Sequence, residues 1–207
     1  MNAIFGRQRL PLWSSGRYFL LLIAVLSGAC TMAPPQPLAG TPWNARQQAL
    51  SALQNWSLTG RIGITTASEG WHGSLRWVQE RQTYLIDIVG PLGQGRINIR
   101  GDADSVTVRT ADGRELSASD AEQLVLDATG LRIPIDGLVY WVRGLPDPRS
   151  ASVLLGDEQG RLTRLEQDGW VIDFTSYQDV AALALPERIS ARQDDLQVKL
   201  VIRQWTL

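Results

Sequence analysis

The middle of the chain alternates apolar and polar residues with a period of two. The segment "WSLTGRIGIT" (56–65) places its apolar residues on one face, and "WHGSLRWVQ" (71–79) repeats the pattern. Strict alternation over this length is typical of antiparallel strands that bury one face and expose the other. The predicted buried faces carry Trp56, Leu58, Ile62 and Ile64 in the first strand, and Trp71, Leu75 and Trp77 in the second.

Shorter runs of the same kind follow, separated by turn residues. The dipeptide Asp112-Gly113 predicts a hairpin turn in the first half of the chain. In total the pattern predicts about ten or eleven strands. Beyond the first two, they are expected over residues 83–89, 95–100, 104–110, 152–155, 161–167, 170–177, 188–192 and 197–205.

Three helices are predicted from their start and stop signals. A threonine followed by proline is typical of an N-cap and a first helical residue, and a serine with glutamate three positions later forms a capping-box pattern. Glycine after the last apolar residue is a common stop. The predicted starts are Thr41, the segment Ser119 to Glu122, and Asp136, and the corresponding ends are about Leu53, Gly130 and Gly144.

This order of elements predicts a mainly β, α+β fold. A large antiparallel sheet must cover its apolar face, and a long sheet tends to curl. We therefore expect a strongly curved sheet with helices as a lid. A lid that fills the concavity incompletely leaves a hydrophobic cavity.

The N-terminal segment has the composition of a secretory signal peptide. Three arginines precede the apolar run "YFLLLIAVL" (18–26), and small residues follow it. A bilayer-spanning helix needs roughly 18 or more apolar residues, so this run is too short to be one. We therefore predict that residues 1–29 are a cleaved signal peptide.

The only cysteine, Cys30, stands where this signal peptide ends. The segment "LSGAC" resembles a bacterial lipobox, although Ser27 occupies the position where leucine is usual. We therefore expect Cys30 to carry covalent acyl groups, and more than one chain is needed for stable anchoring. The next residue is Thr31 and not the aspartate of an inner-membrane retention signal, which favours the outer membrane. No other cofactor is expected.

The residues after Cys30 predict a tether followed by one domain. The segment "TMAPPQPLAGTP" contains four prolines and little that can pack, as in a semi-extended linker. We therefore expect a lipidated, proline-rich tether over residues 30–42 and a single folded domain over 43–207. A chain of this length suits one domain of that size.

Charge and reactive side chains favour binding over catalysis. Removing the three arginines of the leader from the 20 basic residues leaves 17 against 21 acidic ones, a formal charge of −4 that argues against a nucleic-acid partner. The one histidine, His72, lies on a polar strand face, so neither a zinc site nor a nucleophilic triad is expected. We therefore predict no metal and no enzymatic activity.

Two apolar features are candidates for binding. Seven tryptophans follow Cys30, and each either packs the core or lines a cavity for apolar ligands. In addition, "GPLGQG" (90–95) places Leu92 between Pro91 and Gly93 at the tip of a turn, where polar residues are usual. The candidates for the cavity lining are Trp56, Ile62, Ile64, Leu75, Trp77 and Trp141.

From about residue 54 to 205 the sequence resembles the LolB family of outer-membrane lipoproteins. The resemblance is carried by "LTGRIGI", "SLRWVQ", "GPLGQG", "DAEQLVLDATGLRIPIDGLVYWVRGLP" and "VKLVIRQW", together with the lipobox cysteine. It implies an open antiparallel barrel of about eleven strands, with a helical lid over an apolar cavity. It also implies a role in which the protein takes passenger lipoproteins from a LolA-type periplasmic carrier and inserts them into the inner leaflet of the outer membrane.

The resemblance further assigns the turn of Pro91, Leu92 and Gly93 to membrane insertion, with Leu92 projecting into lipid. The protein is then a lipid-anchored monomer that faces the periplasm, with the carrier, passenger lipoproteins and outer-membrane lipid as its partners and no nucleic acid. Two alternatives stay open. One is a periplasmic module of the same fold that senses lipids or lipopeptides, and the other is a structural lipoprotein whose own side chains fill the interior.

Overall fold

The computed structural model describes residues 36–93 and 95–207 of the chain. The predicted signal peptide, Cys30 and the first part of the predicted tether lie outside the described residues. None of the helices in the described part is long and apolar enough to cross a membrane.

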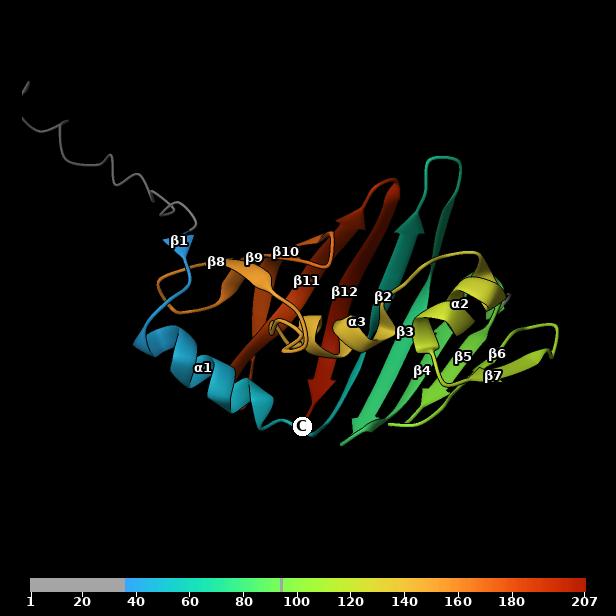
Figure 1. The fold of residues 1–207 in the computed structure, drawn as a ribbon. Coiled ribbons are helices and arrows are strands. Elements are labelled where there is room, and N and C mark those ends of the chain that lie inside the picture. Colours follow the sequence, from blue (N-terminus) through green and yellow to red (C-terminus); the bar gives the residue numbers. More distant parts are fainter. Residues whose placement is uncertain (1–35, 94) are drawn as a thin grey trace, which may run out of the picture. The chain divides into compact units, whose positions relative to one another are not determined.

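In the described part of the chain, twelve strands form one antiparallel sheet (Figure 1). The spatial order is β1-β8-β9-β10-β11-β12-β2-β3-β4-β5-β6-β7, so the sheet is open, with β1 and β7 at its edges. The strands are β1 (Gln36–Pro37), β2 (Asn55–Thr65), β3 (Gly70–Glu80), β4 (Thr83–Val89), β5 (Ile97–Gly101), β6 (Val106–Arg109), β7 (Glu115–Ala118), β8 (Ser152–Gly156), β9 (Leu162–Gln167), β10 (Trp170–Val180), β11 (Leu183–Gln193) and β12 (Leu196–Thr206).

The predicted alternation in β2 and β3 is confirmed. The two strands pair along their whole length, from Asn55 opposite Glu80 to Thr65 opposite Gly70. Trp56, Leu58 and Trp77 are buried, whereas the residues between them point to the other face and are more exposed. The strands with period two therefore form the centre of the sheet and supply one wall of its core.

The largest extension beyond the predicted strands is at the start of β11. Strand β11 begins at Leu183 and not at Arg188, and it continues through Pro186. Proline cannot donate a ladder hydrogen bond, so it argues against a strand in sequence reading. The pairing of β10 with β11 is irregular between Phe174 and Tyr177, directly opposite this segment, and the irregularity accommodates the proline.

The three predicted helices exist, with starts that differ by one or two residues. They are α1 (Thr41–Ser51), α2 (Ala121–Thr129) and α3 (Ile135–Trp141). The N-caps are Gly40, Asp120 and Pro134 in place of Thr41, Ser119 and Asp136. In α2 the Asp120 carboxylate accepts a hydrogen bond from the Gln123 N–H. Asp120 therefore caps this helix in place of the predicted capping box of Ser119 and Glu122. The predicted stop at Gly130 is confirmed, with φ of 74°.

The last residues of the predicted tether belong to the sheet. Gln36 and Pro37 pair with Gly156 and Leu155 of β8. The Leu38 N–H then donates to the Leu154 carbonyl at 3.1 Å, and its side chain packs against the core. The domain therefore starts before residue 43, because this short segment covers the open edge of β8.

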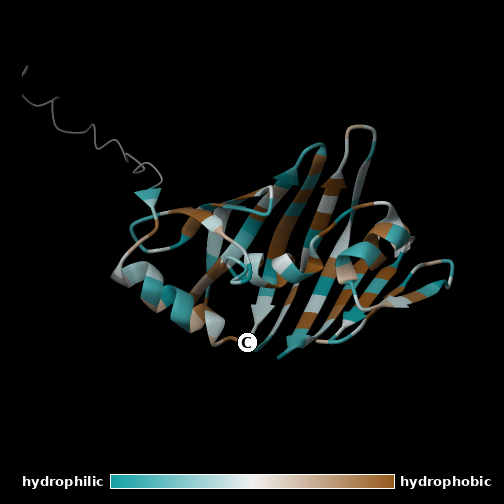
Figure 2. Cartoon of the chain, in the orientation of Figure 1, coloured by the Kyte–Doolittle hydropathy of each residue, from teal (hydrophilic) through white to brown (hydrophobic). Residues whose placement is uncertain are grey.

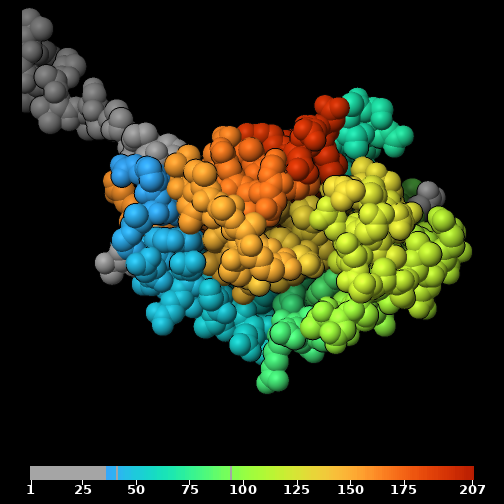
Figure 3. Space-filling model, viewed as in Figure 1, coloured from blue at the N-terminus to red at the C-terminus, as the bar shows by residue number. Residues whose placement is uncertain are grey.

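Helices α2 and α3 lie over the concave face of the sheet (Figures 1 and 3). Apolar residues run in bands along the central strands behind them (Figure 2). The buried residues of the sheet and of these helices form one hydrophobic core. The predicted fold class, a mainly β sheet with a helical lid, is thus confirmed. The described sheet has one strand more than the eleven expected, and the two-residue edge strand β1 was not predicted.

Candidate functional site: an apolar cavity and an exposed leucine turn

A cavity of about 510 Å³ lies between the concave face of the sheet and the lid. Its sheet wall comes from alternate residues of five neighbouring strands, since a pleated strand points every second side chain to the same face. Its lid wall comes from α2, α3 and the residues between them. The lining includes Ile62, Ile64, Trp71, Leu75, Trp77, Ile86, Ile88, Ile97, Ile99, Val198 and Leu200 from the sheet side, and Val125, Ala128, Leu131, Ile133, Ile135 and Leu138 from the lid side.

Four of the six cavity candidates border this cavity: Ile62, Ile64, Leu75 and Trp77. The structure places the other two in the core beside it. Trp56 packs between Trp77 and Trp205, with ring centroids 5.3 and 5.4 Å apart. Trp141 packs on Trp170 at 6.0 Å, and its indole N–H donates to the Gln167 side-chain oxygen at 2.9 Å. Trp56 therefore supports Trp77 of the cavity wall from behind, whereas Trp141 borders a separate, polar cleft.

Sequence reasoning left several lining residues out of its candidates. Trp71 is half-buried and borders the cavity, although the period-two pattern had already placed it on the buried face of its strand. The same pattern in β4 and β5 points Ile86 and Ile99 inward. The lid residues carry no comparable signal, because an apolar helix face is the same whether it meets side chains or a void.

At one end of the strands the cavity is bordered by turns that include polar residues. Glu69 precedes β3, and Thr110 to Arg114 form the turn between β6 and β7. Gly95 and Arg96 also border the cavity, and they belong to the loop between β4 and β5. This is the loop that carries the predicted insertion residue, so the cavity borders this loop.

Within this loop, Leu92 is almost fully exposed and has an unfavourable backbone conformation. Its relative exposure is 97%, and its φ and ψ are 57° and 20°, in the left-handed region. The short 3₁₀ turn Pro91–Gly93 is closed by the Gly93 N–H, which donates to the Gly90 carbonyl at 3.2 Å. A left-handed conformation costs a residue with a Cβ roughly 1–2 kcal/mol. Leu92 thus adopts an unfavourable conformation that burial of its side chain does not offset.

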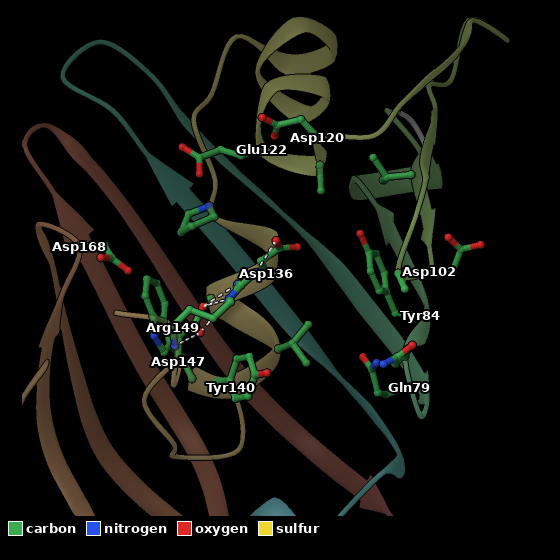
Figure 4. Close-up of a pocket in the computed structure, with 18 of the residues that line it drawn as sticks. Gln79, Tyr84, Asp102, Asp120, Glu122, Asp136, Tyr140, Asp147, Arg149 and Asp168 are labelled. Carbon is green, nitrogen blue, oxygen red and sulfur yellow. Dashed lines mark hydrogen bonds and ion pairs between the residues drawn. The ribbon is translucent and has the colours of Figure 1, made fainter. Parts of the chain in front are cut away.

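A second, polar cleft of about 760 Å³ lies at the other end of β3 and β4 (Figure 4). Arg149 bridges two carboxylates there, Asp136 at 3.1 Å and Asp147 at 2.6 Å. Burial acts to raise the pKa of Asp147, but hydrogen bonds from Arg149 outweigh burial and hold that pKa below its usual range. Burial also raises the pKa of Tyr84 to about 12, and the nearby carboxylates of Asp136 and Asp102 add to the shift.

The described part of the chain contains no group of three or more side chains that could ligate a metal ion. The single histidine, His72, is exposed on β3, as its position on the polar face predicted. The apolar lining of the cavity is suited to enclosing apolar material.

Comparisons with known proteins agree on one family. Residues 54–205 match the family described as outer membrane lipoprotein LolB. The outer-membrane lipoprotein LolB of Pseudomonas syringae pv. syringae is 36% identical over 188 residues, covering 89% of this chain and 92% of the relative. The protein of the same name from Pseudomonas aeruginosa is 37% identical over 187 residues, covering 88% and 91%.

Solved structures with the same fold are much more distant in sequence. A LolA superfamily protein from Nitrosomonas europaea superposes with a TM-score of 0.55 at 9% identity, covering 82% of this chain and 94% of its own. A DUF1329 family protein from Desulfovibrio piger gives 0.53 at 10% identity, covering 80% and 93%. These likenesses concern the fold alone. From the match over residues 54–205 and the relatives that cover most of its length, this chain belongs to the LolB family of outer-membrane lipoproteins.

Proposed function

We propose that this protein accepts lipoproteins from a LolA-type periplasmic carrier, holds their acyl chains in the apolar cavity and inserts them into the inner leaflet of the outer membrane. In this proposal acylated Cys30 anchors a monomer that faces the periplasm. The protein binds and releases its passengers and catalyses no covalent step.

The observation that carries the proposal is the position of Leu92 relative to the cavity. In the loop between β4 and β5, Leu92 is exposed to solvent, and Gly95 and Arg96 of the same loop border the cavity. An acyl chain that leaves the cavity at this loop would emerge next to the residue we propose to contact lipid. Release and membrane contact then occur at one place, without exposing the chain to water over a long path.

Energetics are compatible with transfer that needs no nucleotide. Each methylene whose exposure differs between donor and acceptor contributes roughly 0.8 kcal/mol, so a modest difference in burial directs transfer. Burying the Leu92 side chain in lipid contributes roughly 1.5–3 kcal/mol, which suits a contact that forms and breaks. Because the side chain is already exposed, this contact requires no unfolding of the domain.

The proposal is tested by separating acceptance from delivery. A LolA-type carrier loaded with a labelled lipoprotein is mixed first with the protein alone and then with membranes. We expect Leu92→Glu to accept the passenger at the normal rate but to deliver it into membranes at least tenfold more slowly, because a charge is costly to bury in lipid.

The matched control is Val153→Glu, which places the same charge at another exposed apolar residue, 58% exposed on β8. This variant should accept and deliver normally. Absence of transfer from the carrier to the unaltered protein would contradict the acceptor role and favour a lipid- or lipopeptide-sensing module. Normal delivery by the Leu92→Glu variant would refute the insertion role alone.

A further inference from the structure

The convex face of the sheet, opposite the lid, carries a group of basic residues without acidic partners. Arg61 of β2, Arg188 of β11 and Lys199 of β12 are all exposed, and each alternates with a buried residue that faces the core. Among the described residues, no carboxylate lies within ion-pair distance of any of the three. We call Arg61, Arg188, Lys199 and Val201 the basic patch.

Strand pairing makes the basic patch continuous. Val201, 36% exposed, lies directly between Arg188 on one neighbouring strand and Arg61 on the other. Lys199 occupies the adjacent position of the same face, two residues along β12. Paired strands are spaced about 4.8 Å apart. Three cations around one exposed apolar side chain therefore gather within a small area.

Two carboxylates on nearby strands are already paired with other arginines. Asp87 on β4 is held by Arg96, with two hydrogen bonds of 2.8 Å. Asp173 on β10 forms ion pairs with Arg192 and with Arg164. Because Asp87 and Asp173 are already paired, they do not compensate the positive charge of the basic patch. This charge is therefore left for a partner outside the domain, although the predicted mature chain is net acidic.

The cross-strand row that contains Arg188, Val201 and Arg61 continues toward the turn that carries Leu92. Arg61 pairs with Ser74 of β3, and Ser74 pairs with Val89, the last residue of β4. Leu92 follows three residues later. A surface that contacts Leu92 is therefore adjacent to the end of this row, and the lid with its polar cleft lies on the opposite face of the sheet.

From this arrangement we infer that the basic patch docks on the anionic phospholipid headgroups of the membrane into which Leu92 inserts. Cations near an anionic membrane are attracted within a Debye length, and exposed apolar side chains among them add contact with the interface. The docking turns the convex face toward the lipid and leaves the lid and the polar cleft toward the periplasm. The inference goes beyond the proposed function. Both involve contact between Leu92 and the membrane, but docking of the basic patch requires neither a passenger nor a carrier.

Lys199 allows a direct test, because it is the only lysine in the chain. The processed full-length protein, purified from membranes, is reconstituted in vesicles of phosphatidylcholine alone or with part of it replaced by phosphatidylglycerol. An amine-reactive acetylating reagent is added, and modification of the peptide that contains Lys199 is followed by mass spectrometry. We expect modification to be about fivefold slower or more in the anionic vesicles, and the difference to vanish at high salt.

Two double variants with the same net charge identify the residues responsible. Arg61→Gln with Arg188→Gln should abolish the protection of Lys199. Arg109→Gln with Arg164→Gln removes arginines that already pair with Glu115 and Glu166, and should preserve it. Equal modification in both kinds of vesicle, or protection that survives loss of Arg61 and Arg188, would overturn the inference. Protection that appears only when the carrier is added would overturn it in favour of a protein partner.

Discussion

At the scale of single residues, Leu92 differs from the other strained positions of the chain. Four further non-glycine residues have positive φ among the described residues: Arg81, Asp168, Ala181 and Asp194. Each of these opens a two-residue turn between paired strands, where a left-handed conformation matches the twist of the hairpin. Leu92 lies in a longer loop and buries nothing, so neither hairpin geometry nor packing accounts for a leucine at this position.

We therefore predict that Leu92→Gly leaves the free energy of unfolding unchanged or raises it by up to about 1 kcal/mol. Glycine removes the strain of the left-handed conformation, although it also increases the entropy of the unfolded chain. Urea unfolding followed by tryptophan fluorescence measures the change. A loss of more than about 1 kcal/mol would mean that Leu92 packs in the folded protein, which would weaken its assignment to the membrane.

At the scale of elements, Arg143 connects the lid to α1. It follows α3, is 7% exposed, and donates through its guanidinium to the carbonyls of Leu50 and Leu53 at 3.3 and 3.0 Å and of Val139 at 3.1 Å. Burial lowers its pKa, and the ring of Tyr140 lies 5.4 Å away. The charge is thus compensated by helix-terminal carbonyls, which attract cations.

Replacing Arg143 with methionine should destabilise the domain by about 3 kcal/mol, because buried carbonyls lose their only side-chain donors. Amide exchange should accelerate first at the C-terminal end of α1, since the carbonyls of Leu50 and Leu53 lose their hydrogen bonds from Arg143. Chemical denaturation and hydrogen exchange test both expectations. Arg114→Met serves as the control: that side chain is 65% exposed and pairs only with Asp112. Its loss should cost less than about 1 kcal/mol, and equal losses for both variants would contradict the role of Arg143.

At the scale of the whole domain, the two hollows lie at opposite ends of the central strands. Gln79 and Arg81 at one end of β3 border the polar cleft, whereas Trp71 at the other end borders the apolar cavity. The lid helix α3 contributes Leu138 to the cavity and Tyr140 to the cleft. Movement of this helix would therefore alter both hollows together.

Filling the cavity should block binding of apolar ligands without unfolding the domain. Ala128 lies on the lid wall, and Ala128→Trp places an indole in the space that an acyl chain would occupy. We expect the affinity for a fluorescent fatty acid to fall at least tenfold, measured by titration. The control Ala103→Trp makes the same change at an exposed residue of the polar cleft and should bind normally. Unchanged affinity in the Ala128→Trp variant would place the ligand outside the cavity.

Sequence alone determined much of the architecture. The period of two defined which faces of β2 and β3 are buried, since alternation is a local property of a pleated strand. The stop at Gly130 and the turn at Asp112-Gly113 also follow from local chemistry. Local chemistry did not determine the start of α2, because Ser119 and Asp120 are both good N-cap residues. The structure selects Asp120.

Only the tertiary structure decided which apolar residues meet a void. Trp56 and Trp77 carry the same signal in sequence, yet one is packed between two tryptophans and the other borders the cavity. Likewise, nothing local places the loop of Leu92 beside the cavity or Val201 between two arginines. These relations arise from pairing between strands far apart in the chain. Periodicity sets the face a side chain points to, but long-range register and the fit of the lid set what it meets there.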